Sequence, residues 1–200
     1  MAIEQGIDIN HRKKSLLSVI KMNEKVTYDK LQDPFPKYKW PVSLGRVINF
    51  SSDEVWRIIS MPRNLEEYHP FCSQNRIIKW PGVGSHDEVH YLNGWIFERK
   101  FCKWYEGIGY DLKIGEKEGK LSYVTWRIRS LNTSSSLVTI KIYPNIIQNL
   151  PIVIRWFVYL LKIKPLLTSY LDSVLNGLNW SMVNNKPVKK NQFGNHPWFS

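Results

Sequence analysis

The 200-residue sequence predicts an α+β fold in which a seven-stranded antiparallel sheet wraps around a long C-terminal helix, with two short helices between strands one and two. Three observations predict it. A strand-like segment is followed by two short helical segments that meet at a Met-Pro pair. Turn-forming residues then recur at regular intervals and separate six further strand-like segments. Finally, apolar residues recur at helical spacing near the end of the sequence.

The first strand is expected over 42–50, where the sequence reads VSLGRVINF. Ser51 or Ser52 is expected to cap the helix that follows, because a serine hydroxyl can accept a hydrogen bond from a free backbone N–H at a helix start. Pro62 ends this helix and opens a second one, since proline fits the first turn of a helix but not its interior. Pro70 closes the second helix.

The remaining six strands are expected to form an antiparallel meander. They are expected over 75–80, 85–92, 95–105, 108–114, 120–130 and 137–143. Asn93-Gly94 separates the second and third of these and is the strongest short hairpin signal in the sequence. A two-residue loop there would place Glu88 opposite Arg99.

A similar two-residue loop is expected at Glu106-Gly107, and the loops together determine which side chains share a face of the sheet. The apolar face is expected to contain Phe97, Phe101, Tyr105, Ile108, Tyr110, Leu112, Ile114, Val124, Trp126, Ile128, Val138, Ile140 and Ile142. The same register brings polar side chains to this inner face, namely His86, Glu88, His90, Arg99 and Lys103. Polar groups would be costly in a dry core, so the sheet is expected to enclose a hydrated cavity.

The last helix is expected to pack on the concave side of the sheet, which is the only apolar partner available to it. Apolar residues recur at helical spacing over 164–183, at Leu167, Leu171, Val174 and Leu178. The expected organisation is an N-terminal arm over 1–40, a domain over 41–184 and a basic, aromatic tail over 185–200.

The composition favours a cytoplasmic protein with an anionic or apolar partner. The net charge is +11 and the pI about 9.6, but no nucleic-acid-binding signature accompanies the charge, so no nucleic acid is expected as a partner. The two cysteines, Cys72 and Cys102, suit a reducing compartment, and the first residues lack the pattern of a signal peptide. The high content of Trp, Tyr and Phe, 14% of the residues, suits an apolar cavity.

Three stretches of the sequence resemble one superfamily. They read FSSDEVWRIISMPRNLEEYHPF, WPGVGSHDEVHY and FCKWYEGIGYDL. They are similar to the START and birch-pollen-allergen superfamily, also called SRPBCC or polyketide cyclase/dehydrase-like, and the resemblance covers about residues 42–183. It implies the helix-grip fold, with a cavity for a hydrophobic or amphipathic molecule between sheet and helix. Some members are cyclases, dehydratases or hydrolases, and many only bind or carry their ligand.

Binding of a hydrophobic or amphipathic small molecule is therefore the expected function, with no cofactor and no metal. The expected ligand-binding residues are His69, His86, Glu88, His90, Phe97, Arg99, Phe101, Tyr110, Trp126, Leu171 and Val174. In one alternative the protein is an enzyme that uses His69, or the wall of His86, Glu88 and His90, as acid and base. The same three side chains could bind zinc, but the sequence shows no fourth ligand. Arg99 either forms a cross-strand ion pair or holds the acidic head of a ligand.

A further alternative is a lipid-transfer or membrane-surface protein. The segment 145–165 is nearly all apolar and departs from the superfamily pattern, in which the last strand leads almost directly into the long helix. Residues 151–163 would be apolar around nearly the whole helix, so something must cover them. An anionic lipid interface, a second subunit of a homodimer, or the arms of a monomer could do so, and the arms are favoured because they contain Trp and Phe without another evident reason. In the tail, Phe193, Trp198 and Phe199 are expected to fold back onto an apolar groove.

Overall fold

The computed structural model describes residues 31, 40–145 and 151–200. The chain divides into two units, Met1–Gln32 and Asp33–Ser200, and everything below concerns the second unit. Most of the arm expected over 1–40, and the part of the apolar segment over 146–150, lie outside the described residues.

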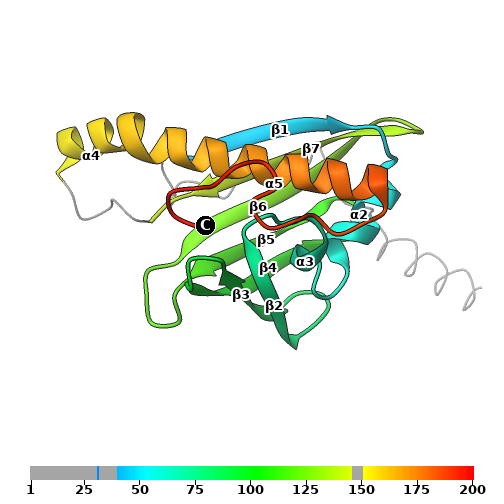
Figure 1. Ribbon diagram of the computed structural model, residues 1–200, viewed down its shortest axis with the longest axis horizontal. Coiled ribbons are helices and arrows are strands. Elements are labelled where there is room, and N and C mark those ends of the chain that lie inside the picture. Colours follow the sequence, from blue (N-terminus) through cyan, green and yellow to red (C-terminus); the bar gives the residue numbers. More distant parts are fainter. Residues whose placement is uncertain (1–30, 32–39, 146–150) are drawn as a thin grey trace, which may run out of the picture. The chain divides into compact units, whose positions relative to one another are not determined.

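Seven antiparallel strands form one sheet in the order β1-β7-β6-β5-β4-β3-β2 (Figure 1). The strands are β1 (Val42–Ile48), β2 (Cys72–Lys79), β3 (His86–Tyr91), β4 (Ile96–Tyr105), β5 (Gly109–Gly115), β6 (Ser122–Asn132) and β7 (Ser135–Tyr143). Strands β2 to β7 form the expected meander, and β1 joins β7 at the far edge. The expected seven-stranded sheet is therefore confirmed.

Two short helices, α2 (Ser52–Ser60) and α3 (Leu65–Tyr68), connect β1 to β2, as expected. Ser51 caps α2: its hydroxyl accepts from the backbone N–H of Glu54, and the Glu54 carboxylate accepts from the backbone N–H of Ser51. The second helix is shorter than expected, because the residues after Pro62 form a turn before α3 begins.

The C-terminal helix is continuous from α4 (Ile152–Val158) through a π-helical turn, η2 (Tyr159–Ile163), into α5 (Lys164–Asn184). Figure 1 shows α5 running across one face of the sheet, where the core lies. Close packing of α5 on α3 requires glycine at 177, because a Cβ there would lie 2.0 Å from the backbone oxygen of Tyr68. None of the helices among the described residues is long and apolar enough to span a membrane.

The hairpin between β3 and β4 has a three-residue loop, so the expected register of β3 is wrong. The backbone N–H of Tyr91 donates to the oxygen of Trp95 at 2.8 Å, and Gly94 closes the loop at a φ of 89°. Asp87 rather than Glu88 consequently pairs with Arg99. One extra loop residue turns over every side chain of the strand, so His86, Glu88 and His90 face away from the core.

The hairpin between β4 and β5 also has a three-residue loop, but a bulge at Cys102 compensates for it. The expected pairings of Phe101 with Leu112 and of Arg99 with Ile114 are therefore confirmed. Between the bulge and the loop, the side chains of β4 point to the opposite faces of the sheet from those expected. Two predictions are therefore wrong. Tyr105 is not a core residue, since its ring lies under the guanidinium of Arg127 at 5.3 Å, and Lys103 lies on the outer face, 3.9 Å from the carboxylate of Asp111. The expected register of the last hairpin, with Trp126 opposite Ile140, is confirmed.

Candidate functional site

A cavity of about 340 Å³ lies between the sheet and α5. The side chains around it come from β3 to β7, α3, α5 and the C-terminal tail, and most of them are apolar. They are Leu65, His69, Tyr91, Trp95, Phe97, Arg99, Leu112, Ile114, Ser122, Val124, Trp126, Ile140, Ile142, Pro144, Leu167, Tyr170, Leu171, Val174, Trp198 and Phe199. Its volume is at the lower end of the range of small-molecule pockets in proteins.

The structure brings together only part of the residues expected to bind a ligand. Those that line the cavity are His69, Phe97, Arg99, Trp126, Leu171 and Val174. Phe101 and Tyr110 are buried beside it, with their rings 5.0 Å apart. Whether any of these side chains contacts a ligand remains a prediction.

The expected polar wall of His86, Glu88 and His90 does not line the cavity, because the register of β3 places it on the outer face. There Glu88 accepts two hydrogen bonds from the exposed Arg76, at 2.7 and 2.8 Å. His90 Nε2 lies 3.5 Å from the same carboxylate, and His86 Nε2 lies 3.7 Å from Glu98. Arg76 and Glu88 form a cross-strand ion pair, and His86 faces Glu98 across the next pair of strands, whereas His90 and Glu88 belong to the same strand.

Arg99 forms a buried ion pair with Asp87 at one wall of the cavity. Its Nε donates to Asp87 Oδ1 at 2.8 Å and its Nη2 to Asp87 Oδ2 at 2.5 Å. The Nη2 group also lies 3.3 Å from Asn64 Oδ1 and 3.5 Å from Asn75 Oδ1. Burial alone would lower the pKa of Arg99, but the Asp87 carboxylate outweighs burial and raises it. The pair is neutral as a unit, so the wall presents no net charge.

A chain of hydrogen bonds links His69, Tyr170 and Tyr91 at the cavity. The backbone N–H of Phe71 donates to His69 Nδ1 at 3.3 Å, His69 Nε2 lies 2.8 Å from the Tyr170 hydroxyl, and that hydroxyl lies 3.2 Å from the Tyr91 hydroxyl. Burial, with a smaller contribution from the charge of Arg99, lowers the pKa of His69 to about 3, so the imidazole is neutral. Because Nδ1 accepts, the proton of the neutral ring is on Nε2 and is donated to Tyr170.

This hydrogen-bond chain contains one more polar hydrogen than it has hydrogen bonds. Its polar hydrogens belong to the Phe71 amide, His69 Nε2 and the two phenol hydroxyls, whereas only three contacts join them. Burial raises the pKa of both phenols, that of Tyr91 to about 12, so both keep their protons. One phenol O–H, on Tyr91 or Tyr170, is therefore left over at the cavity wall.

The C-terminal tail closes one side of the cavity. Its backbone bonds to the segment around α3, with the N–H of Asn191 donating to the oxygen of Pro70 at 2.9 Å. The ring of Phe199 is buried 4.6 Å from that of Tyr170 and 4.7 Å from that of Tyr91. Trp198 lines the cavity as well, so these two aromatic residues fold back as the sequence suggests, whereas Phe193, which was expected to join them, does not line the cavity.

Sequence reasoning missed several residues of this site, namely Asn64, Asn75, Asp87, Tyr91 and Tyr170. Tyr170 had a detectable signal, because it stands at helical spacing from apolar residues on both sides of it in α5. Asp87 and Tyr91 would have followed from the correct register of β3. The two asparagines gave no signal, since their positions depend on packing between distant segments.

Searches against protein-family models and curated proteins found no match. Many solved structures are similar, and three of them serve as examples. A START superfamily protein from Mycobacterium smegmatis is 14% identical with a TM-score of 0.59, over 73% of this chain and 99% of that one. Ara h 8.0201 is 11% identical with a TM-score of 0.52, over 73% and 99%. The di-domain ARO/CYC BexL from the BE-7585A biosynthetic pathway is 9% identical with a TM-score of 0.57, over 72% of this chain and 48% of that one. Identities this low show the fold alone, and the expected helix-grip fold is confirmed.

Proposed function

We propose that this protein binds a hydrophobic or amphipathic small molecule in the cavity between the sheet and α5. The observation that supports the proposal most is the cavity itself. Protein cores pack densely and contain few voids larger than a water molecule, whereas this one holds about 340 Å³ within a mainly apolar wall. The similar folds include a START superfamily protein and an ARO/CYC protein, which is consistent with a ligand but does not identify it.

The polar groups of the wall favour a neutral ligand with a hydrogen-bond acceptor. Arg99 is already neutralised by Asp87, so a ligand carboxylate would have to compete with a buried partner bonded through two nitrogens. The interpretation of Arg99 as the anchor of an acidic head therefore has less support than the ion pair. The spare phenol O–H of Tyr91 or Tyr170 instead offers a donor to a carbonyl, ether or hydroxyl oxygen.

Acid–base catalysis has less support than binding. Of the groups proposed for it, His86, Glu88 and His90 lie on the opposite face of the sheet. His69 lines the cavity, but its pKa of about 3 is far from neutral pH, where an efficient general base should titrate. Its Nε2 proton is also engaged with Tyr170.

Native mass spectrometry of the purified protein tests the proposal first, because a retained ligand would appear as added mass. Prodan, a neutral naphthalene ketone whose emission shifts to the blue in apolar surroundings, provides a binding assay. We expect saturable binding that Val174→Phe abolishes by filling the cavity from α5. The matched control is Val183→Phe on the exposed side of the same helix, which should bind as the parent does.

The spare hydroxyl gives a finer test with the same probe. Losing one neutral hydrogen bond costs about 0.5–1.5 kcal/mol, so Tyr91→Phe combined with Tyr170→Phe should weaken Prodan binding by about 2- to 12-fold. Parent protein that neither retains a ligand nor binds Prodan, or a folded Val174→Phe variant that binds Prodan as the parent does, would contradict the proposal.

A further inference from the structure

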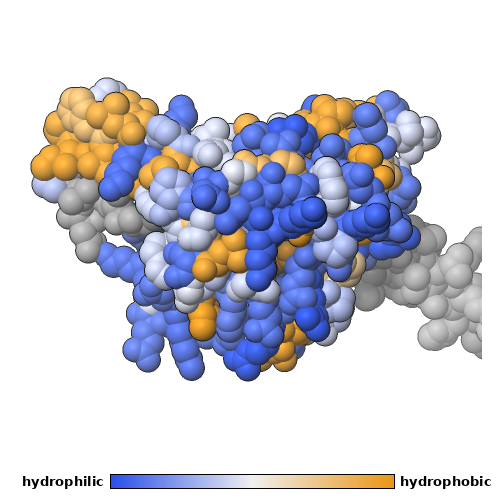
Figure 2. Space-filling model, in the orientation of Figure 1, coloured by the Kyte–Doolittle hydropathy of each residue, from blue (hydrophilic) through white to orange (hydrophobic). Residues whose placement is uncertain are grey.

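The first turns of the C-terminal helix expose a large apolar surface. We call residues 152–161 the helix tip. Its exposed apolar side chains are Ile152, Val153, Ile154, Trp156, Phe157 and Leu161. None of the residues of α4 is buried, and Figure 2 shows an apolar cluster over this end of the helix. Soluble proteins seldom expose a contiguous apolar patch of this kind without a partner.

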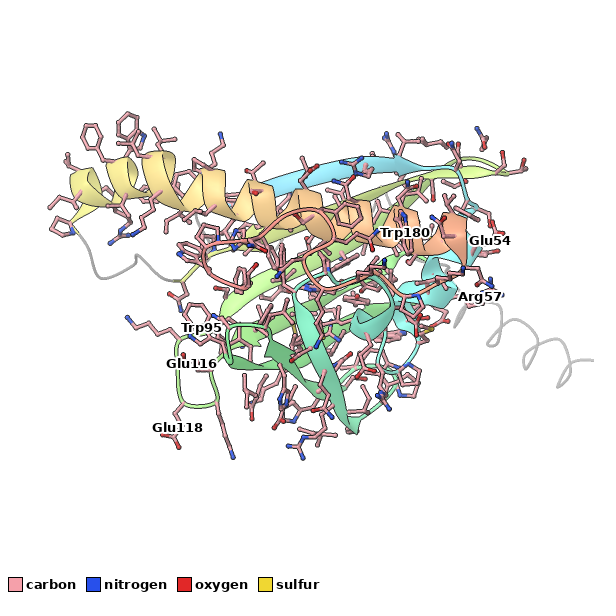
Figure 3. All side chains as sticks on the ribbon, viewed as in Figure 1. Glu54, Arg57, Trp95, Glu116, Glu118 and Trp180 are labelled. Atoms are coloured by element: carbon pink, nitrogen blue, oxygen red, sulfur yellow. The ribbon has the colours of Figure 1, made fainter. Side chains whose placement is uncertain are left out.

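The charged residues in the sequence around the helix tip are all basic. No Asp or Glu occurs between Glu118 and Asp172, whereas that stretch contains seven Lys and Arg residues. Three of the seven, Arg155, Lys162 and Lys164, belong to the helix itself. Figure 3 shows Glu116 and Glu118 on the β5–β6 loop, well apart from α4. The helix tip therefore combines an apolar surface with a basic border.

We propose that the helix tip docks on an anionic lipid bilayer. Apolar side chains with Trp would enter the boundary between head groups and acyl chains, and the basic side chains would meet the lipid phosphates. Arg155, Lys162 and Lys164 interrupt the apolar stretch, so the proposed contact is at the surface of the bilayer.

The distribution of the exposed side chains favours lipid over a second copy of the chain. At 100° per residue, Ile152 and Ile154 point to nearly opposite sides of the helix, and both are exposed. A folded partner would cover one side of the first turn, whereas a fluid interface can contact both of these exposed side chains.

The helix tip itself is held to the domain near its C-terminal end, through Tyr159. The hydroxyl of Tyr159 donates to the oxygen of Pro41 at 2.8 Å, and its ring lies 5.7 Å from that of Trp40. The C-terminal tail does not cover the tip, since its aromatic residues Trp198 and Phe199 pack at the cavity instead. No tip residue lines the cavity, so the proposal is independent of the proposed ligand binding.

Sedimentation of the full chain with vesicles tests the proposal. We expect binding to vesicles of phosphatidylcholine with about 30% phosphatidylserine, and at least about fivefold weaker binding when NaCl rises from about 0.1 to 0.5 M, because salt screens the basic residues. Phe157→Asp, at a side chain that is 51% exposed, should weaken binding at least about tenfold. Val183→Asp, at an equally apolar but distant position of the same helix that is 63% exposed, should bind within about twofold of the parent.

Three results would overturn the proposal. One is the absence of parent protein from pelleted anionic vesicles. A second is equal binding by the parent and by Phe157→Asp, with melting temperatures showing both folded. The third is a dimer without lipid that Phe157→Asp dissociates, in the absence of vesicle binding, which would assign the tip to a second copy of the chain.

Discussion

Replacing Asp87 by Asn would leave the guanidinium of Arg99 charged and unpaired in the interior. Asp87 is 0% exposed and Arg99 is 3% exposed, so bulk water has little access to either side chain. Breaking a buried ion pair from one side costs about 3–5 kcal/mol. In a domain of this size about 1 kcal/mol shifts the melting temperature by about 2–4 °C, so we expect Asp87→Asn to lower it by about 6–20 °C.

The neighbouring pair on the outer face is a matched control. Glu88 follows Asp87 on the same strand and is bonded to Arg76 through two nitrogens, but Arg76 is largely exposed. Exposed ion pairs contribute about 0–1 kcal/mol, so Glu88→Gln should cost less than about 1 kcal/mol. The contrast between the two variants isolates burial as the cause.

A double-mutant cycle completes the test. Removing both charges together, as Asp87→Leu with Arg99→Met, should recover most of the loss and bring the free energy of unfolding within about 2 kcal/mol of the parent, because no uncompensated charge remains. Urea denaturation at pH 7, followed by tryptophan fluorescence, measures all the variants. Two results would contradict this expectation. One is a loss of less than about 1 kcal/mol in the free energy of unfolding of Asp87→Asn. The other is a loss in the double variant as large as the sum of the losses in the single variants Asp87→Leu and Arg99→Met.

Three other variants test the fold and the site. Gly177→Ala should lower the free energy of unfolding by about 1–3 kcal/mol, because its Cβ would press on the backbone of Tyr68, and an unchanged urea midpoint would contradict this close contact. Burial lowers the pKa of His69 from 6.5 to about 3, so between these pH values the unfolded chain binds a proton that the folded chain does not. The free energy of unfolding therefore decreases as the pH is lowered, by roughly 2 kcal/mol from pH 7 to pH 5. The variant His69→Gln should remove that part of the slope in urea denaturation, and an unaltered slope would show that His69 can be protonated in the folded state. Phe199→Ala should release the tail, since Phe199 packs on Tyr91 and Tyr170, and limited proteolysis should then cut faster within 185–200 than in the parent.

The order of the elements could be predicted from the sequence because it depends on local signals. The Ser51 cap, the regular turns and the helical spacing around Leu171 are each determined by residues close together in the chain. The register of β3 is different, because Asn93-Gly94 fits both a two-residue and a three-residue loop. The alternative with the longer loop buries Val89 and Tyr91, but it also buries Asp87, which is acceptable only because Arg99 meets it.

The composition of the site depended on contacts that no local pattern encodes. The bulge at Cys102 has no sequence signature, yet it decides that Arg99 and Phe101 face inward together while Lys103 faces outward. Closure of the cavity by Trp198 and Phe199 joins the tail to strands about a hundred residues earlier. Patterns in a single sequence predict which face of a helix or strand is apolar. They do not predict which distant segments meet, so the composition of this cavity wall could not be predicted.

The three-residue loop between β3 and β4 also has an evolutionary consequence. Deleting one residue from 92–94 would leave a two-residue turn and turn over every side chain of β3. Asp87 would leave the interior, and two imidazoles and a carboxylate would enter it beside Arg99, which are groups used in acid–base catalysis. The loss of one codon would thus exchange a neutral cavity wall for an ionisable one. Loss of the buried Val89 side chain and of the Asp87–Arg99 pair would select against that step, yet within this fold the two kinds of cavity wall differ by a single residue of loop length.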